Sequence, residues 1–275
     1  MSTRDVFQKI GDLGSDAVQT IIDRLEYRGS DPTFVRMRER YLDQMGLGRK
    51  ARVLDLGCGT GVVSRALAER EGSTLEVVGI DVSQALIGAA QQLAAAKRLD
   101  DRIEFRVGDS HALEEPDHSY DFVIAHTLLS HVVDPAAVIS EASRVVRPNG
   151  IVAVFDGDYA SLSYGSGNAT MNAKMVNGIL AAIVANPNVM RQIPTFLKDI
   201  GLKVMGFLPD VHAEAEAGAF FINLAESYVP IAVKAGTLSR DAADRWLAEQ
   251  RDASLHGTFF GSCNYYTYLA QKPAD

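Results

Sequence analysis

The chain has 275 residues, of which 47% are hydrophobic and 23% are charged, as is ordinary for a folded globular protein. Its 27 Lys and Arg against 35 Asp and Glu give a formal net charge of −8. This charge disfavours nucleic acid as a partner, because nucleic-acid binders usually carry a basic surplus. Two cysteines, Cys58 and Cys263, are too few for a disulfide framework or a four-cysteine zinc site, so we expect no metal centre.

No apolar run approaches the roughly 18 residues of a membrane helix, so we expect no membrane span. Residues 1–5 lack the hydrophobic segment of a secretory signal, and together with the few cysteines this favours a cytoplasmic location.

The first fifty residues are expected to be helical. An N-cap at residues 14–16 is followed by apolar residues spaced three or four apart, which predicts a first helix. Asp31-Pro32 predicts the start of a second helix, since proline is favoured at the first helical position, and Gly46 predicts its end.

Residues 51–156 alternate short apolar runs with helical stretches. The strand-like runs are 52–56, 75–80, 103–107, 122–125 and 151–155. The helical stretches between them are 62–70, 84–99 and 135–146. Near-continuous apolar strands in β-α-β order predict a parallel sheet that is covered by helices on both faces.

The regular alternation ends after residue 156. Residues 157–168 are rich in Gly, Ser and Tyr, and this composition predicts a loop. The remaining expected elements are helices at 171–185 and 191–200, a strand at 202–208, a helical block at 218–250 interrupted at Pro230 and Gly236, and a closing strand at 258–269. The helical block would then be an insertion before the last strand.

The most informative stretch is Val53-Leu54-Asp55-Leu56-Gly57-Cys58-Gly59-Thr60-Gly61, a strand that runs into a glycine turn at the start of a helix. Glycines let the backbone lie against a bound nucleoside, and the helix N-terminus behind them favours negative charge. A dinucleotide site would need G-x-G-x-x-G/A, but the third position after Gly59 is Val62. An NAD(P)-dependent oxidoreductase is therefore a less favoured alternative.

At these residues the chain resembles the class I S-adenosyl-L-methionine-dependent methyltransferases. Asp55 to Gly61 matches the family's first motif, Asp81 its second acidic position and Asp109 its third. Residues 120–124 resemble the family's fourth strand, and residues 144–150 resemble the helix and turn before the fifth. The resemblance covers roughly residues 51–156 and places the chain nearest the ubiquinone, menaquinone and natural-product methyltransferases.

The resemblance implies an α/β fold with a Rossmann-like, seven-stranded, mostly parallel sheet and helices on both faces. It also implies S-adenosyl-L-methionine as cofactor and S-adenosyl-L-homocysteine as product. We expect a single domain over residues 1–275: a helical cap over 1–50, a cofactor-binding core over 51–156, and a substrate-side and lid region with closing strands over 157–275.

The cofactor residues are predicted from this match and from side-chain chemistry. The acceptor-only carboxylate of Asp81 can take both ribose hydroxyls, and Asp109 or Ser110 can take the adenine amino group. Asp55 and the glycine turn would face the methionine end. The predicted set is Asp55, Gly57, Cys58, Gly59, Asp81, Val82, Asp109, Ser110 and His126. Arg36 or Arg40 could pair with the cofactor carboxylate.

Catalytic candidates are expected after the fourth and fifth strands, because ligands in open α/β sheets bind outside the carboxyl ends of the strands. A histidine with a pKa near about 6.5 is suited to accept a proton from the methyl acceptor. His126 could contact the cofactor, pack in the structure or act as a base. His131 could cap or pack against a helix, or it could act on the substrate. The catalytic candidates are His131, Asp158 and His126, with Asp156 and His212 as weaker ones.

We expect the acceptor to be a small molecule that is methylated on O or N, or on an activated carbon, in secondary or quinone-type metabolism. Ala125-His126-Thr127-Leu128 follows the fourth strand, in place of the Asn-Pro-Pro-Tyr tetrad of enzymes that methylate nucleic-acid bases. The shortage of thiols disfavours arsenite. The alternative is a non-methylating protein of the same fold, either a pericyclase-like enzyme or a partner subunit.

One helical face carries a group of large apolar side chains: Phe220, Phe221, Leu224 and Tyr228. Such a face is equally suited to packing on the sheet and to forming the interface of a homo-oligomer.

Overall fold

The computed structural model describes residues 15–70, 72 and 74–274, so the expectations for residues 1–5 and for the cap residue Gly14 lie outside it. The helices are α1 (Ser15–Ser30), α2 (Pro32–Gln44), α3 (Val62–Glu69), α4 (Gln84–Ala96), α5 (Pro135–Val145), α6 (Ala169–Ile183), the short η2 (Val189–Arg191), α7 (Ile193–Asp199), α8 (Ala219–Lys234) and α9 (Arg240–Leu255). The strands are β1 (Arg52–Leu56), β2 (Glu76–Asp81), β3 (Ile103–Val107), β4 (Tyr120–His126), β5 (Val146–Tyr164), β6 (Lys203–Glu216) and β7 (Phe259–Gln271). No helix within the described residues is long and apolar enough to cross a membrane.

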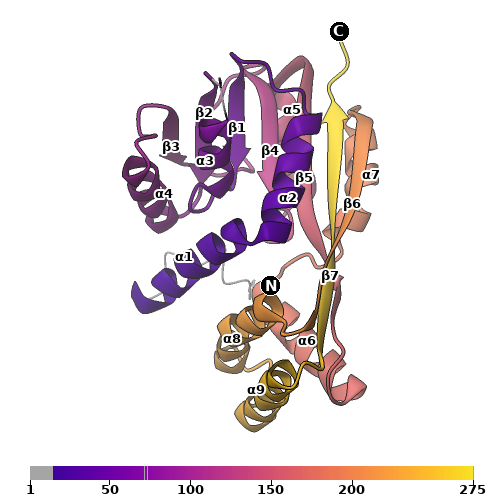
Figure 1. Cartoon of the computed structure of the whole chain (residues 1–275). Coiled ribbons are helices and arrows are strands. Elements are labelled where there is room, and N and C mark those ends of the chain that lie inside the picture. The colour runs from indigo at the N-terminus through magenta and orange to yellow at the C-terminus, as the bar shows by residue number, and fades with distance from the viewer. Residues whose placement is uncertain (1–14, 71, 73, 275) are drawn as a thin grey trace.

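The seven strands form one sheet in the order β3-β2-β1-β4-β5-β7-β6 (Figure 1). Strands β1 to β5 run parallel, and β7 lies antiparallel between β5 and β6. This confirms the expected seven-stranded, mostly parallel sheet. The helical insertion is confirmed as well, since α8 and α9 lie between β6 and β7 in the chain.

The central strands β1, β2 and β4 are buried on both faces of the sheet, which explains why their sequences are mostly apolar. In β1, Val53 packs into the core under α2, α3 and α4, whereas the next residue, Leu54, packs into the core under α5 and α7. Both side chains are fully buried. Alternate residues of a strand point to opposite faces, so a strand covered on both sides needs apolar residues at every position.

The prediction of a loop at residues 157–168 was wrong over residues 157–164. Strand β5 continues to Tyr164 because β7 runs beside it, with Asp158 opposite Asn264 and Tyr164 opposite Gly261. The Gly- and Ser-rich composition resembles that of a loop, but an antiparallel partner satisfies the backbone hydrogen bonds of the segment. Strand β6 is also longer than predicted, so His212 lies within it rather than after it.

Helix α8 passes through Pro230 without the expected interruption. Its apolar face is buried inside the protein, with Phe220 and Phe221 fully inaccessible and Leu224 and Tyr228 nearly so. This burial decides between the two uses that the sequence left open: the face packs within the chain and is not an oligomer interface.

The extended ends of β5 and β7 carry α6, α8 and α9 beyond the carboxyl edge of the parallel strands (Figure 1). Asn172 of α6 fastens this group. Its Nδ2 donates to the carbonyl oxygens of Tyr164 at 2.9 Å and Ser166 at 2.8 Å. Its Oδ1 accepts from Nε1 of Trp246 at 2.7 Å. One buried amide therefore links β5, α6 and α9.

We predict that Asn172→Ala lowers the free energy of unfolding by about 3 kcal/mol, because it removes the acceptor of the buried indole N–H of Trp246 and the donor to the carbonyls of Tyr164 and Ser166. Urea denaturation followed by tryptophan fluorescence measures the change. Asn188→Ala, at an exposed asparagine whose side chain makes no cap, is the matched control. A wild-type midpoint for Asn172→Ala would contradict this role.

Candidate active site

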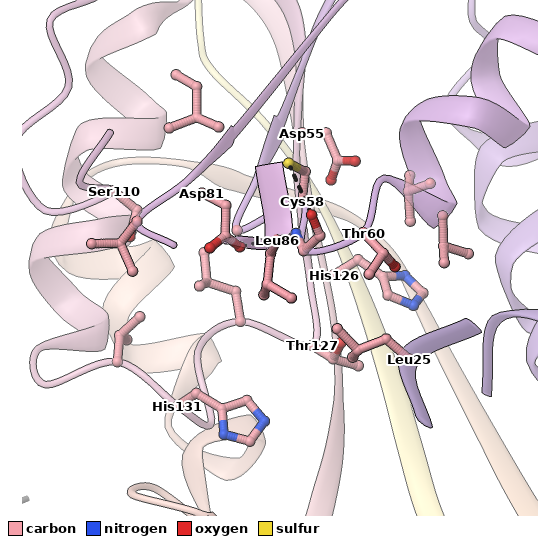
Figure 2. Close-up of a pocket in the computed structure, with 18 of the residues that line it drawn as sticks. Leu25, Asp55, Cys58, Thr60, Asp81, Leu86, Ser110, His126, Thr127 and His131 are labelled. Atoms are coloured by element: carbon pink, nitrogen blue, oxygen red, sulfur yellow. Dashed lines mark hydrogen bonds between the residues drawn. The ribbon is translucent and has the colours of Figure 1, made fainter. Parts of the chain in front are cut away.

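A cavity of about 380 Å³ opens at the carboxyl ends of β1, β2 and β4, where α1 crosses the edge of the sheet (Figure 1). Figure 2 shows the predicted residues Asp55, Asp81, Ser110, His126 and His131 gathered around it. The lining also includes the other predicted cofactor residues, namely Gly57, Cys58, Gly59, Val82 and Asp109. The topology thus brings together side chains from four separate loops.

The floor of the cavity is the glycine turn after β1. Gly57 has a φ of +63°, which favours glycine, and a Cβ there would lie 2.4 Å from Cδ1 of Leu128. The turn is fastened to β2 by Asp81, whose Oδ2 accepts from the N–H of Gly59 at 2.9 Å. Oδ1 of Asp81 accepts from the N–H of Ser83, also at 2.9 Å. The hydrogen bond from Gly59 to Asp81 therefore holds the turn against β2, and Leu128 leaves no room for a side chain at Gly57.

Asp55 is buried at the end of β1, where its Oδ2 accepts from Oγ of Ser64 at 2.6 Å. Burial raises the pKa of Asp55 to about 7, and the nearby charge of Asp81 acts in the same direction. Burial also raises the pKa of Asp81. A charge placed beside Asp55 would therefore change its protonated fraction near neutral pH.

Asp109 follows β3 and is held by His111. Its Oδ1 accepts from the backbone N–H of His111 at 2.9 Å and from the ring Nδ1 at 2.7 Å. Partial burial acts to raise the pKa of Asp109, but the contacts with His111 leave it lowered overall. His111 lines the cavity and was not predicted, although its position two residues after a predicted ligand is a usable sequence signal.

His126 ends β4 and lies against aromatic rings. Its Nδ1 is 2.9 Å from the hydroxyl of Tyr41, and its ring stacks on Phe155 with centroids 4.4 Å apart. Burial lowers the pKa of His126 well below its usual value, and the positive charges of Arg28 and Arg38 lower it further. The imidazole is therefore neutral at physiological pH.

Arg28 and Arg38 also line the cavity, although the sequence did not predict them there. Nη2 of Arg28 donates to Oγ1 of Thr127 at 2.8 Å, and Nη1 of Arg38 donates to the carbonyl of Gly29 at 3.1 Å. The predicted Arg36 is exposed and lies outside the cavity lining, and Arg40 pairs with Asp210 at 2.9 Å.

The helical period explains this correction. Arg38 lies one turn after the buried Phe34 and one turn before the buried Tyr41, on the inner face of α2. Arg36 and Arg40 occupy the outer face. Counting from the apolar residues of the helix could have selected Arg38 in advance.

The two carboxylates of β5 do not reach the cavity lining. Asp158 is buried and accepts from Arg191 at 2.9 to 3.2 Å through both oxygens, and this pairing disfavours the catalytic role predicted for it. Asp156 is fully buried, and its oxygens accept from the backbone N–H groups of Ser130 and Gly157. Both acids are engaged by protein donors and lie outside the cavity lining.

His131 lies on the cavity wall, in the loop that Asp156 holds through Ser130. Burial raises the pKa of Asp156, and the charge of a protonated His131 opposes that rise. His212 packs between Phe34 and Phe220, with centroids at 5.4 and 4.4 Å, and lies outside the cavity lining. Of the histidine candidates, His126 and His131 therefore face the cavity and His212 does not.

Residues 47–173 match the family model described as a methyltransferase domain. The chain is 31% identical over 232 residues to an uncharacterised 37.1 kDa protein of a transposon from Streptomyces fradiae, a match that covers 84% of this chain and 65% of that protein. It is 35% identical over 121 residues to the 27-O-demethylrifamycin SV methyltransferase of Amycolatopsis mediterranei, a match that covers 44% of each. The chain thus spans less than two thirds of the length of these relatives.

Solved structures share the fold. A phosphoethanolamine N-methyltransferase of Haemonchus contortus, in complex with S-adenosyl-L-methionine, superimposes with a TM-score of 0.55 at 23% identity over 86% of this chain and 52% of that one. The [4+2]-cyclase SpnF superimposes with a TM-score of 0.55 at 22% identity over 88% and 82%. At these identities the likeness shows the fold alone.

The fold and site define a Rossmann-like protein with a cavity at the carboxyl edge of its sheet. Residues 47–173 are similar to a methyltransferase domain, and the relatives of that part of the chain include a named methyltransferase. The residues fit S-adenosyl-L-methionine as cofactor: Asp81 offers carboxylate oxygens for the ribose, and a side chain at Gly57 would fill the space beside Leu128.

We predict that S-adenosyl-L-methionine binding releases protons near pH 7, because a cationic ligand favours the charged form of Asp55 and lowers its pKa from about 7. Affinity should therefore rise as pH increases through about 7. Calorimetry in buffers of different ionisation enthalpy measures the protons released. Asp55→Asn should abolish this release, and an equal release in the variant would contradict the assignment.

Proposed function

We propose that this protein transfers a methyl group from S-adenosyl-L-methionine to an oxygen or nitrogen of a small-molecule acceptor. The observation that carries the proposal is the position of Asp81. Its carboxylate lies beside a glycine turn in a cavity large enough for a nucleoside, at the strand end where the family binds ribose. When bound, the cofactor supplies the methyl group as a sulfonium substituent.

The nucleoside would lie along the ends of β1 to β3. Asp81 would accept from the ribose hydroxyls with the lone pairs that Gly59 and Ser83 leave available. Oδ1 of Asp109 is engaged by His111, so Oδ2 of Asp109 or the neighbouring Ser110 would contact the adenine amino group. The turn backbone and Asp55 would face the methionine end.

The acceptor would enter beside the loop after β4. Leu128, Val132 and Val133 give this wall an apolar character, which suits a ring-bearing or otherwise apolar molecule. The relative named for a rifamycin supports an acceptor from secondary metabolism.

His131 is the candidate proton acceptor on this wall. Asp156 fixes the backbone of the preceding residue, Ser130, and so holds the loop that places His131 on the cavity wall. A neutral histidine in this place can take the proton that an attacking hydroxyl or amine loses. Release of S-adenosyl-L-homocysteine with a candidate acceptor would separate methyl transfer from a non-methylating role of the same fold.

We predict that Asp81→Ala weakens S-adenosyl-L-homocysteine binding at least about 100-fold, because two charge-assisted hydrogen bonds to the ribose are lost. Asp81→Asn keeps the side-chain shape and one acceptor oxygen, so it tests binding even if the alanine variant misfolds. Asp101→Ala, at an exposed aspartate outside the cavity lining, is the control. Wild-type affinity in both Asp81 variants, measured by calorimetry, would overturn the ribose assignment.

We predict that His131→Gln lowers turnover about 100-fold with any acceptor that the wild type methylates, because general-base assistance is lost. Affinity for S-adenosyl-L-homocysteine should stay within about twofold of wild type if His131 faces the acceptor rather than the cofactor. Turnover is followed as S-adenosyl-L-homocysteine release. Wild-type kcat in this variant would exclude His131 as the base.

A further inference from the structure

Tyr41 and His126 form a hydrogen-bonded pair that none of the roles above uses. The hydroxyl of Tyr41, on the inner face of α2, lies 2.9 Å from Nδ1 of His126 at the end of β4. Tyr41 is fully buried, and its ring lies 5.9 Å from that of Phe155, on which the imidazole stacks. The imidazole is thus held at one edge by a hydroxyl and on one face by a ring.

The burial of Tyr41 decides which partner donates the proton. Among the described residues the Tyr41 hydroxyl bonds to His126 alone. If Nδ1 carried a proton, the hydroxyl hydrogen would be buried without an acceptor, which costs more than a spare lone pair. The hydroxyl therefore donates and Nδ1 accepts. A neutral histidine with an unprotonated Nδ1 carries its proton on Nε2.

The other ring nitrogen is the one left for a ligand. His126 lines the cavity while its Nδ1 is engaged by Tyr41, and Nε2 has no hydrogen-bond partner among the described residues. Burial lowers the pKa of His126, and the charged side chains that lower it further are Arg28 and Arg38. Arg28, Arg38 and His126 all line the cavity, and each carries N–H groups that can donate hydrogen bonds to a ligand.

We propose that Tyr41 is a positioning residue that fixes His126 as the Nε2–H tautomer. His126 is then a permanent hydrogen-bond donor to a carboxylate oxygen of the bound cofactor, and it is not a base. This inference rests on the proposed function for the identity of the ligand, but the tautomer itself is a property of the free protein. Of the two predicted histidines that line the cavity, it leaves His131 as the candidate proton acceptor.

The first test measures the tautomer directly. Long-range ¹H–¹⁵N spectra of the ligand-free protein report the protonation of each ring nitrogen, and His126→Gln identifies the signals of His126 by their disappearance. We expect an unprotonated Nδ1 and a protonated Nε2, unchanged between about pH 6 and about pH 8. In Tyr41→Phe the proton should redistribute between the two nitrogens. A protonated Nδ1 in the wild type, or an unchanged spectrum in Tyr41→Phe, would overturn the proposal.

The second test uses S-adenosyl-L-homocysteine as the probe. His126→Phe, which has no donor, should bind it about tenfold more weakly, and His126→Gln, which keeps an amide N–H, should recover part of that loss. Tyr268→Phe, at a tyrosine outside the cavity lining, is the control for loss of a hydroxyl. Wild-type affinity in His126→Phe would exclude the donor role toward the cofactor.

Failure of the proposed function gives a different result. A wild-type protein that does not bind S-adenosyl-L-homocysteine at all would contradict the proposed activity and the assigned ligand together. The ligand-free spectra would still decide whether Tyr41 fixes the tautomer of His126.

Discussion

The hydrogen bond from the N–H of Gly59 to Oδ2 of Asp81 is the contact on which the rest of the site depends. It joins the turn after β1 to the end of β2, and the N–H of Cys58 adds a second link to the carbonyl of Ile80 at 3.0 Å. The turn has no side chain at Gly57 or Gly59, so its backbone can form the floor of a cavity. The same carboxylate that shapes this floor is then available to a ligand.

The charges around the cavity fall into two groups. Asp55 and Asp81 lie close enough for the charge of one to raise the pKa of the other, and both are buried or partly buried. Arg28 and Arg38 act instead on His126, whose pKa they lower. A ligand with a cationic centre and a carboxylate matches this separation, because each of its charges can lie near a group of opposite sign. S-Adenosyl-L-methionine carries such charges, which is why the electrostatics agree with the domain match.

The structure also separates residues that line the cavity from residues that hold its loops. Asp156 and Asp158 lie within β5, just past its parallel pairing with β4, and each accepts hydrogen bonds from protein donors. Asp156 holds the backbone of Ser130, next to His131, so it acts on the cavity wall through the loop. Neither acid lines the cavity, so a ligand there would meet the glycine turn and the loops after β2, β3 and β4.

The local patterns of the parallel core were sufficient to predict it. Strands 52–56 and 103–107 have the bounds that their apolar runs indicate, and Asp81 lies at the strand end where the motif requires it. These features depend on neighbours in the sequence. The length of β5 could not be predicted, because residues 157–164 become a strand only when β7, about a hundred residues later, pairs with them.

The site residues outside the motifs were predicted less well, for the same reason. Arg28 reaches the cavity because α1 crosses the edge of the sheet, which no local pattern of charge reveals. Asp158 was predicted to be catalytic from its position after a strand, but Arg191, which neutralises it, comes from η2. The local sequence shows which side chains lie near a turn. It does not show which of them form an ion pair or hydrogen bond with a residue far away in the chain.

The most direct measurement is a crystal structure of the protein grown with S-adenosyl-L-homocysteine. The account predicts ribose hydroxyl oxygens within about 3.2 Å of the Asp81 carboxylate, and the methionine carboxylate beside Arg28 and Nε2 of His126. A ligand bound elsewhere, or a ribose in this cavity that makes no contact with Asp81, would contradict it.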